Sequence, residues 1–293
     1  MGSLDYRALA VLDAVASHGS FEKAAAALGI SQSAVSQRIK ALEDASGRLL
    51  IIRGQPAVPT GLGQRLITHH RHVKLMEASL DIDLGNTVSM PELAIAIDDD
   101  SLATWFPDAL APLLAPPRCQ LDVRLADSDS ALQMVRDGTV FGCVASDTGS
   151  DAHAASVTPL GTLRHVCVAT PVFAGHWFGD GFSAAAVQLA PAVVGQHSLL
   201  ARFLAEQLDL HAPFPHHRLP LAAARRACIE DGLAYGLMPQ RLAAPYLATD
   251  RLLDLVPGFT LDVPLHWHAW SLDTPYTKLL SEQIVRSARA YLS

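Results

Sequence analysis

The sequence predicts an α/β protein built in three parts: a small helix-turn-helix head, one long helix and a larger domain in which strands and helices alternate. Three observations lead to this prediction. Two short amphipathic segments joined by a glycine lie between residues 20 and 43. A heptad-like row of apolar residues follows, from 62 to 80. Beyond a polar break at 85–91, short apolar runs alternate with helical patterns.

The length and the charge distribution agree with this division. A chain of 293 residues with half of them apolar suits two or three compact units. The net charge is −7, yet residues 1–88 carry nine Lys and Arg against eight Asp and Glu. Within 31–74 there are seven basic and two acidic residues. A basic head on an acidic body is typical of a DNA-binding module joined to a regulatory domain.

The cysteines and the apolar runs indicate a cytosolic location. The four cysteines are far apart and form no C-x-x-C pair, which favours free thiols in a reducing compartment (Cys119, Cys143, Cys167 and Cys228). No basic segment precedes the first apolar residues, and no apolar run approaches the ~20 residues that a bilayer requires. We therefore expect a cytoplasmic protein without a membrane partner.

The head is predicted to hold three helices. The first spans residues 5–18 and has one apolar face. Ser20 can cap a second helix that ends at Gly29, a residue suited to a left-handed end. Ser31 can then cap a third helix, whose buried face is Val35, Ile39 and Leu42 at helical spacing. Two short helices joined by a tight turn make a helix-turn-helix.

The outer face of the third helix is predicted to contact DNA. Short hydroxyl and amide side chains at its start and along this face can hydrogen-bond to base edges in a major groove (Ser31, Gln32, Ser33, Ser36 and Gln37). Arg38 and Lys40 are placed for phosphates, which supply register and affinity. The alternative is the ordinary polar face of an amphipathic helix.

A wing is expected to follow. Residues 49–52 are β-like and residues 53–59 turn back, which places Arg53 near a phosphate or the minor groove and Thr60 near the DNA backbone. The alternative for Arg53 is an ordinary surface charge.

These residues carry a family likeness. Residues 6–66, and within them 21–25, 31–43 and 59–66, resemble the winged helix-turn-helix of LysR-type transcriptional regulators. The chain as a whole, including residues 94–106, is similar to the ArgP/LysG branch, which controls the export of lysine and arginine. Many family members have a second basic residue in the wing, where this chain has Gln55, Ala57 and Val58, so fewer wing contacts are expected.

The long helix is expected from about residue 62 to 84. Its apolar seam steps by four and three residues, with one histidine in it (Leu62, Leu66, His69, Val73, Met76 and Leu80). By the resemblance, this is the linker helix that pairs two subunits; the alternative is that the seam packs on its own chain. The cluster at His69, His70 and His72 is expected to be a solvated face rather than a metal site, because neighbouring helical side chains diverge.

The domain boundaries follow from these elements. We expect a head at 1–60, a linker helix at 61–88 and an effector-binding domain at 89–293 with mainly parallel sheets. The resemblance implies two subdomains of periplasmic-binding-protein type, 89–161 with 265–293 and 162–264. The expected strands are 93–97, 121–126, 141–145, 164–170, 192–194, 233–238 and 264–270. The expected helices are 102–114, 130–137, 199–208, 221–230, 239–248 and 276–292.

A ligand site is expected beyond the carboxyl ends of these strands, where open α/β sheets bind ligands. Amides and Ser101 at the start of the helix after the first strand would suit a carboxylate, and nearby aspartates would suit a cation. The candidate contacts are Asp99, Ser101, Thr104, Asp127, Asp129, Asp147, Gln196 and Ser198. Opposing loops stand at 196–198 and 219–222.

Lysine and arginine each have a carboxylate and a separate ammonium or guanidinium group, so both would fit such a site. The likeness to the ArgP/LysG branch suggests the same ligands; the spacing of the residues alone does not identify them. Each candidate has a plainer reading, because Ser101 can serve only as a cap and loop aspartates often form turns. Asp98 and Asp100 are expected to be merely solvated.

The predicted function is a DNA-binding transcriptional regulator whose operator contacts respond to a small molecule. Its expected partners are double-stranded promoter DNA, the effector, RNA polymerase and a second or further copies of the chain, as a homodimer or homotetramer. No cofactor or metal is expected. One alternative is a sequence-tolerant architectural or replication-inhibiting DNA-binding protein. The other is an enzyme using His266 and His268 or His216 and His217, which lack partners at metal-site spacing and stand without a catalytic motif.

Overall fold

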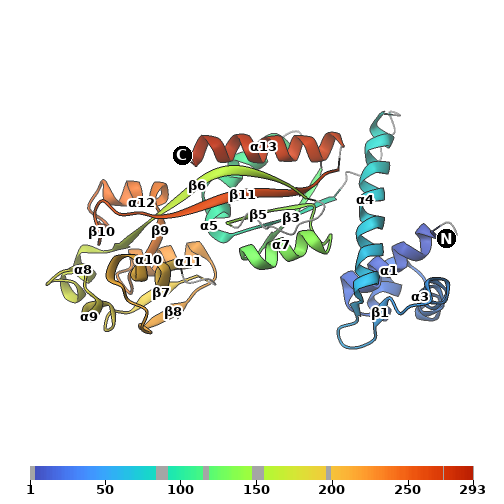
Figure 1. Ribbon diagram of the computed structural model, residues 1–293, viewed down its shortest axis with the longest axis horizontal. Coiled ribbons are helices and arrows are strands. Elements are labelled where there is room, and N and C mark those ends of the chain that lie inside the picture. The colour runs from blue at the N-terminus through green and yellow to red at the C-terminus, as the bar shows by residue number, and fades with distance from the viewer. Residues whose placement is uncertain are drawn as a thin grey trace.

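The computed structural model describes residues 4–83, 92–114, 119–146, 155–195, 199–272 and 274–292. It consists of a helical head, the long helix α4 and an elongated α/β domain (Figure 1). The predicted break at 85–91 and three candidate site residues, Asp147, Gln196 and Ser198, lie outside the described residues.

The head is held by the caps that the sequence predicts. Its helices are α1 (Tyr6–His18), α2 (Phe21–Leu28) and α3 (Gln32–Ser46). The Ser20 hydroxyl accepts the Lys23 amide, and the Ser31 hydroxyl accepts the Ala34 amide at 3.2 Å. Gly29 ends α2 with φ +64°. The three helices share one apolar core, to which α3 contributes Val35, Ile39 and Leu42.

The wing is a short antiparallel pair, β1 (Ile51–Ile52) with β2 (Val58–Pro59). Glu43 at the end of α3 orients it, because its Oε1 accepts the amides of Leu50 and Ile51. The Thr60 hydroxyl donates to the Leu49 carbonyl at 2.9 Å and accepts the Gly63 amide at 3.1 Å. Thr60 therefore joins the wing to the start of α4.

The long helix α4 (Gly61–Asp83) packs on its own chain over part of the predicted seam. Leu62 and Leu66 lie against the head core. The neighbouring Leu75 lies against the core of the α/β domain. Further along, Met76 and Leu80 are 46% and 57% exposed. The seam is thus divided between an intrachain part and an exposed part.

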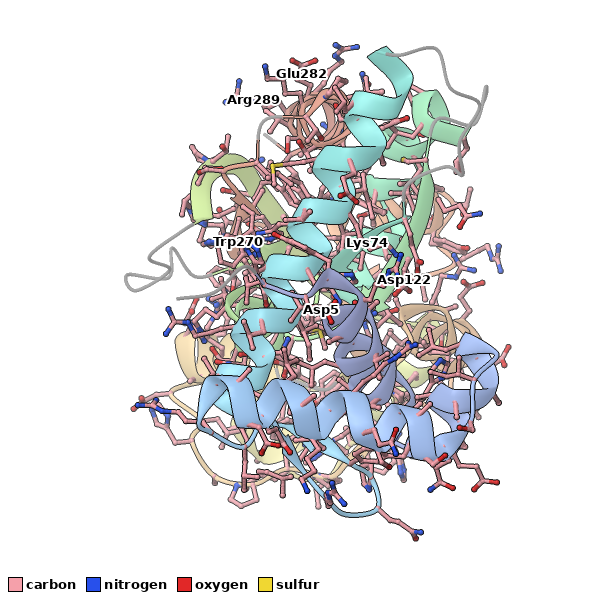
Figure 2. The ribbon with its side chains drawn as sticks, turned by 90° about the vertical axis from the view of Figure 1, so that its right-hand side faces the viewer. Asp5, Lys74, Asp122, Trp270, Glu282 and Arg289 are labelled. Atoms are coloured by element: carbon pink, nitrogen blue, oxygen red, sulfur yellow. The ribbon has the colours of Figure 1, made fainter. Side chains whose placement is uncertain are left out.

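The histidine cluster of α4 differs from the prediction of a solvated face. His69 is exposed, as expected. His70 is buried and lies 3.4 Å from Asp13 of α1. The His72 ring meets Trp270 edge-on at 4.8 Å between centroids, where α4 passes in front of the α/β domain (Figure 2). The prediction was wrong for His70 and His72, because α4 is covered on these sides by α1 and by the α/β domain.

The sheet of the α/β domain is mixed. Its strand order is β10-β6-β11-β5-β3-β4, with β9 also paired to β6. β3 (Glu92–Ile97) is parallel to β4 (Gln120–Leu125) and to β5 (Gly142–Ala145). The long strands β6 (Ala155–Ala169) and β11 (Leu261–Trp270) are antiparallel to each other, and β11 is antiparallel to β5.

Further antiparallel pairs join β6 to β9 (Gly236–Pro239) and to β10 (Leu253–Asp254). The prediction of mainly parallel sheets was therefore wrong. The sheet is mixed because β6 carries the chain from the first lobe to the second and β11 carries it back. The two strands that connect the lobes therefore run in opposite directions.

The domain has two lobes joined by β6 and β11 (Figure 1). The first lobe contains β3, β4 and β5 with α5 (Asp99–Ala103), α6 (Phe106–Leu114), α7 (Ser128–Arg136) and α13 (Pro275–Tyr291). The second lobe contains β9 and β10, the parallel pair β7 (Ala192–Val194) and β8 (His216–Arg218), and α8 (Pro171–Trp177), α9 (Ala184–Val187), α10 (Leu199–Leu208), α11 (Ala222–Glu230) and α12 (Gln240–Leu247).

The predicted crossing points at 161 and 265 both fall inside the paired strands. Gly161 has φ +131°, and a Cβ there would lie 2.7 Å from the Leu292 Cβ. The register of β11 shifts between Leu265 and His266. The exact subdomain boundaries stay a prediction.

The start of α5 also differs from the sequence expectation. The cap is Asp98, whose Oδ1 accepts the Ser101 amide at 2.8 Å, and not Ser101. The single helix expected at 102–114 is two helices, α5 and α6. The helices α8 and α9 and the strands β8 and β10 had no prediction, because their patterns extend over only a few residues.

Candidate functional site

The outer face of α3 stands clear of the head core. Gln32, Ser33, Gln37, Arg38 and Lys40 are exposed. Two further predicted residues also lie at the surface of α3: Ser36, which is half-buried, and Ser31, whose hydroxyl lies 2.9 Å from that of Ser33. Short hydroxyl and amide groups beside two cations form a surface that can contact bases and phosphates in one groove.

The two predicted wing residues differ in their surroundings. Arg53 is exposed, and its guanidinium carbon lies 5.5 Å from the centre of the Phe21 ring. This position places a cation beside the start of α2, the first helix of the helix-turn-helix. The Thr60 hydroxyl is engaged with the backbone of residues 49 and 63, so Thr60 has a structural role at the start of α4.

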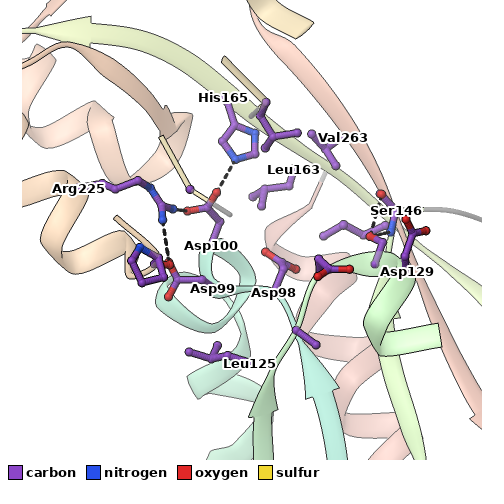
Figure 3. A pocket seen from close by; sticks show the side chains of 17 residues that line it. Asp98, Asp99, Asp100, Leu125, Asp129, Ser146, Leu163, His165, Arg225 and Val263 are labelled. Atoms are coloured by element: carbon purple, nitrogen blue, oxygen red, sulfur yellow. Dashed lines mark hydrogen bonds and ion pairs between the residues drawn. The ribbon is translucent and has the colours of Figure 1, made fainter. Parts of the chain in front are cut away.

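A second candidate site is a cavity of about 470 Å³ between the two lobes (Figure 3). Three strand ends of the first lobe meet there: residues 98–100 follow β3, residues 127–129 follow β4, and Ser146 follows β5. The second lobe contributes Gly195, Pro220 and Arg225. The rule that ligands bind beyond the carboxyl ends of the strands therefore located the cavity correctly.

Arg225 of α11 reaches across this cavity to the first lobe. Its Nη1 lies 3.2 Å from Asp99 Oδ2, and its Nη2 lies 2.7 Å from Asp100 Oδ1. The side chain is only 9% exposed. It is held on its own lobe by donating to the carbonyls of Leu219 and Pro220, both at 3.1 Å. A charge pair with this burial and this number of hydrogen bonds is costly to break on one side.

Two more groups complete this arrangement. The Ala222 amide at the start of α11 donates to Asp99 Oδ2. The buried His165 ring places Nε2 3.2 Å from Asp100 Oδ2. We call Arg225, Asp99, Asp100 and His165 the Arg225 clamp, because they tie the two lobes and β6 together.

The carboxyl groups of this region differ in their electrostatics. Burial raises the pKa of Asp98, against the opposing effect of the Ser101 hydroxyl and amide. Burial also acts to raise the pKa of Asp100, but the hydrogen bond from His165 and the charge of Arg225 hold that pKa below its ordinary value. Asp100 is thus stabilised as an anion inside the clamp, whereas burial disfavours the ionised form of Asp98.

The predicted effector contacts fall into three groups. Asp99, Asp127 and Asp129 line the cavity. Ser101 is fully buried and Thr104 donates its hydroxyl to the Asp100 carbonyl at 2.7 Å; neither lines the cavity. Asp147, Gln196 and Ser198 are outside the described residues. The roles of all of them in binding stay predictions.

The expectation that Asp98 and Asp100 are merely solvated was wrong: one caps α5 and the other belongs to the clamp. The cap is the first aspartate of the run rather than the serine, so the Ser101 amide is already bonded to the Asp98 carboxylate. Binding of a ligand carboxylate at the start of α5 stays a prediction.

Sequence reasoning missed His165 and Arg225. Arg225 lies in the helix expected at 221–230, and His165 lies in the strand expected at 164–170, which is only the last part of β6; neither residue belongs to a motif. They are 65 and 125 residues from Asp100, so no local spacing could indicate the contacts.

The other histidines form no metal site in the part of the chain that the structure describes. His266 and His268 lie on β11 with ring centroids 6.4 Å apart. Among the described residues, no group of three or more His, Cys, Asp or Glu could hold a metal ion. No helix of the described ranges has both the length and the apolar character needed to span a membrane.

Comparison with known proteins identifies the family to which this chain belongs. Residues 6–64 match the bacterial regulatory helix-turn-helix protein of the LysR family, and residues 87–289 match the LysR substrate binding domain. The chain therefore belongs to the LysR family of DNA-binding transcriptional regulators, which are not enzymes.

Within this family the chain is similar to proteins named ArgP and LysG. The HTH-type transcriptional regulator ArgP of Pseudomonas aeruginosa is 39% identical over 291 residues, 97% of this chain and 96% of that protein. The crystal structure of ArgP from Mycobacterium tuberculosis has a TM-score of 0.87 at 32% identity, over 99% of both chains. Full-length LysG from Corynebacterium glutamicum with bound effector Arg has a TM-score of 0.79 at 32% identity, again over 99% of both.

Proposed function

We propose that this regulator binds promoter DNA in response to a basic amino acid, arginine or lysine, and controls amino-acid export. The observation that carries the proposal is the cavity between the lobes, lined by five aspartates against one arginine (Asp98, Asp99, Asp100, Asp127, Asp129 and Arg225). Such an excess of carboxylates favours a cationic ligand. The similar LysG structure holds arginine as its effector, which supports the same class of ligand here.

The DNA-contacting surface is the outer face of α3 with the wing. Gln32, Ser33, Ser36 and Gln37 contact bases, while Arg38, Lys40 and Arg53 hold phosphates. Two such heads on a pair of subunits read two half-sites of an operator, and RNA polymerase is the partner at the promoter.

Dimerisation is assigned to the far part of α4. Met76 and Leu80 are large apolar side chains that are about half exposed and lie one turn apart on α4. A second copy of α4 covers them in the proposed homodimer or homotetramer. The protein acts in the cytoplasm, where its DNA is.

The helix α7 links the cavity to the head within one chain. Residues 127–129 at its start line the cavity. Just after its end, the Asp137 carbonyl accepts the Thr68 hydroxyl at 2.6 Å and the Gln64 side-chain amide, both from α4. A ligand that favours one position of α7 thereby favours one position of α4.

The same contact reaches the helix-turn-helix. Arg71 of α4 donates to the Gly138 carbonyl at 3.3 Å and to Asp13 of α1 at 2.7 Å. The α7–α4 contact and the head therefore share one side chain. An effector with unequal affinity for two arrangements of these parts would shift the spacing of the paired heads.

The test is a thermal-shift series on the full-length protein with each of the twenty amino acids, followed by footprinting on genomic fragments that the protein enriches. We expect arginine or lysine to raise the melting temperature and to change the footprint. Equal, salt-sensitive binding to all fragments would instead identify a sequence-tolerant DNA-binding protein. A footprint that responds to none of the twenty would overturn the effector proposal.

A further inference from the structure

We infer that Asp98, and not Asp99 or Asp100, is the carboxylate that takes the cationic side-chain group of the effector. This inference rests on the proposed basic effector and names the residue that selects for it. Figure 3 shows Asp98 inside the cavity, between the Arg225 clamp on one side and Ser146 with Asp129 on the other.

Asp99 and Asp100 already have their cations. Arg225 contacts both, the Ala222 amide adds a donor to Asp99, and His165 adds one to Asp100. A ligand cation at either carboxylate would have to displace a buried guanidinium that also donates to two carbonyls of its own lobe. Leaving that guanidinium unpaired would oppose binding.

Asp127 and Asp129 are also poor candidates for the central contact. Asp127 caps α7, and its two oxygens accept the Ser130 amide at 2.8 Å and the Ser130 hydroxyl at 2.9 Å. Asp129 is exposed at the rim, where water and salt weaken its attraction for a cation.

Among the described residues, no arginine or lysine pairs with Asp98. Its Oδ1 accepts the Ser101 amide, and the Ser101 hydroxyl in the same turn also acts on this carboxyl group, but both of these neighbours are neutral. The buried Oδ2 has no hydrogen bond of regular geometry in the part of the chain that the structure describes. A buried carboxylate without a counter-ion is costly, and a guanidinium or ammonium group placed beside it removes this cost.

The first experiment compares Asp98→Asn with Asp99→Asn in the full-length protein. Asn keeps the shape of Asp and an oxygen that can cap α5, but it removes the charge. We expect Asp98→Asn to weaken arginine binding at least tenfold by calorimetry, with an unchanged or higher melting temperature without ligand. Asp99→Asn, which loosens the clamp, should lower the ligand-free melting temperature and keep the arginine-induced rise.

The second experiment separates charge recognition from a structural role. Citrulline has nearly the shape of arginine without the positive charge. Asp98→Asn should lose affinity for arginine while its affinity for citrulline stays the same or rises. A variant that had merely distorted the cavity would lose affinity for both ligands by similar factors, and this result would overturn the inference.

Two further outcomes are distinguishable. If wild-type protein binds arginine and Asp98→Asn binds it equally well, Asp98 is not the contact although the proposed function stands. If wild-type protein binds no cationic amino acid, the proposed effector class itself is wrong. Should Asp98→Asn fail to fold, as judged by circular dichroism, Asp98→Ser provides a second uncharged cap on which the same measurements decide.

Discussion

Arg225 Nη2 lies 2.7 Å from Asp100 Oδ1, and this contact ties α11 of the second lobe to α5 of the first. Both residues lie at the cavity that separates the lobes. The position of one lobe relative to the other is therefore set at the same place where an effector would bind. A ligand bound there would therefore act directly on the geometry of the domain.

Arg225→Met should destabilise the α/β domain. Removal of the guanidinium leaves Asp99 and Asp100 without their shared cation, and loss of one partner of a buried ion pair costs about 3–5 kcal/mol. Urea unfolding measures the effect. The control is Arg226→Met on the same helix, because the Arg226 side chain is 40% exposed and pairs with Glu230 in the next turn. Equal losses for the two variants would show that the clamp contributes nothing specific.

Ser36→Ala combined with Gln37→Ala should abolish operator preference while leaving weak, salt-sensitive binding. Each lost base contact costs roughly 1–3 kcal/mol of discrimination, whereas phosphate contacts are unaffected. Gel shifts against operator and unrelated DNA measure this. Arg38→Ala is the comparison variant, expected to weaken binding to both DNAs alike. An unchanged preference in the double variant would show that α3 does not read the bases.

Asp13→Asn should lower the stability of the head at neutral pH and flatten its acid dependence. Although burial raises the pKa of Asp13, the hydrogen bonds from His70 and Arg71 outweigh it and lower that pKa to about 2. At pH values above the ordinary aspartate pKa of ~3.9, the ionised Asp13 therefore contributes roughly 2 kcal/mol to the free energy of unfolding.

This contribution is present above the unfolded-state pKa and is lost as the pH falls towards 2. Urea unfolding at several values between pH 6 and pH 2.5 should show the loss for wild type and not for Asp13→Asn. Asp44→Asn, at an exposed position of α3, serves as the control and should behave like wild type. An equally steep decline in Asp13→Asn would contradict the assignment.

Thr68→Val should uncouple the cavity from DNA binding. The substitution keeps the size of the side chain but removes the hydroxyl that donates to the Asp137 carbonyl after α7. Arginine should still raise the melting temperature, while its effect on operator affinity falls. Thr68→Ser, which keeps the donor, should respond like wild type. A full response in Thr68→Val would exclude this contact as part of the coupling.

Leu80→Asp should dissociate the proposed assembly. Leu80 is 57% exposed on α4, and a charge there cannot be buried against a second helix without a large penalty. Light scattering coupled to gel filtration gives the mass. Leu189→Asp, at a leucine of the α/β domain that is 69% exposed, is the matched control. A mass that Leu80→Asp leaves unchanged would place the dimer contact elsewhere.

The helix-turn-helix could be predicted almost residue by residue. Ser20, Gly29 and Ser31 act on amides and carbonyls within four residues of themselves, and Val35, Ile39 and Leu42 share a face through the helical period alone. The family likeness and the location of the cavity followed from the same local patterns. Such features depend on neighbours in the chain, so the order of residues is enough to predict them.

The clamp, the mixed sheet and the burial of His70 required the folded chain. Arg225 meets Asp100 across 125 residues, and the antiparallel path of β6 and β11 decides which loops face each other. Asp100 was expected to be solvated, but the same long-range packing brings it against Arg225, where it is the anion of a buried ion pair. Charge pairing and desolvation depend on distances in space, and sequence separation carries almost no information about those distances once the chain has folded back on itself.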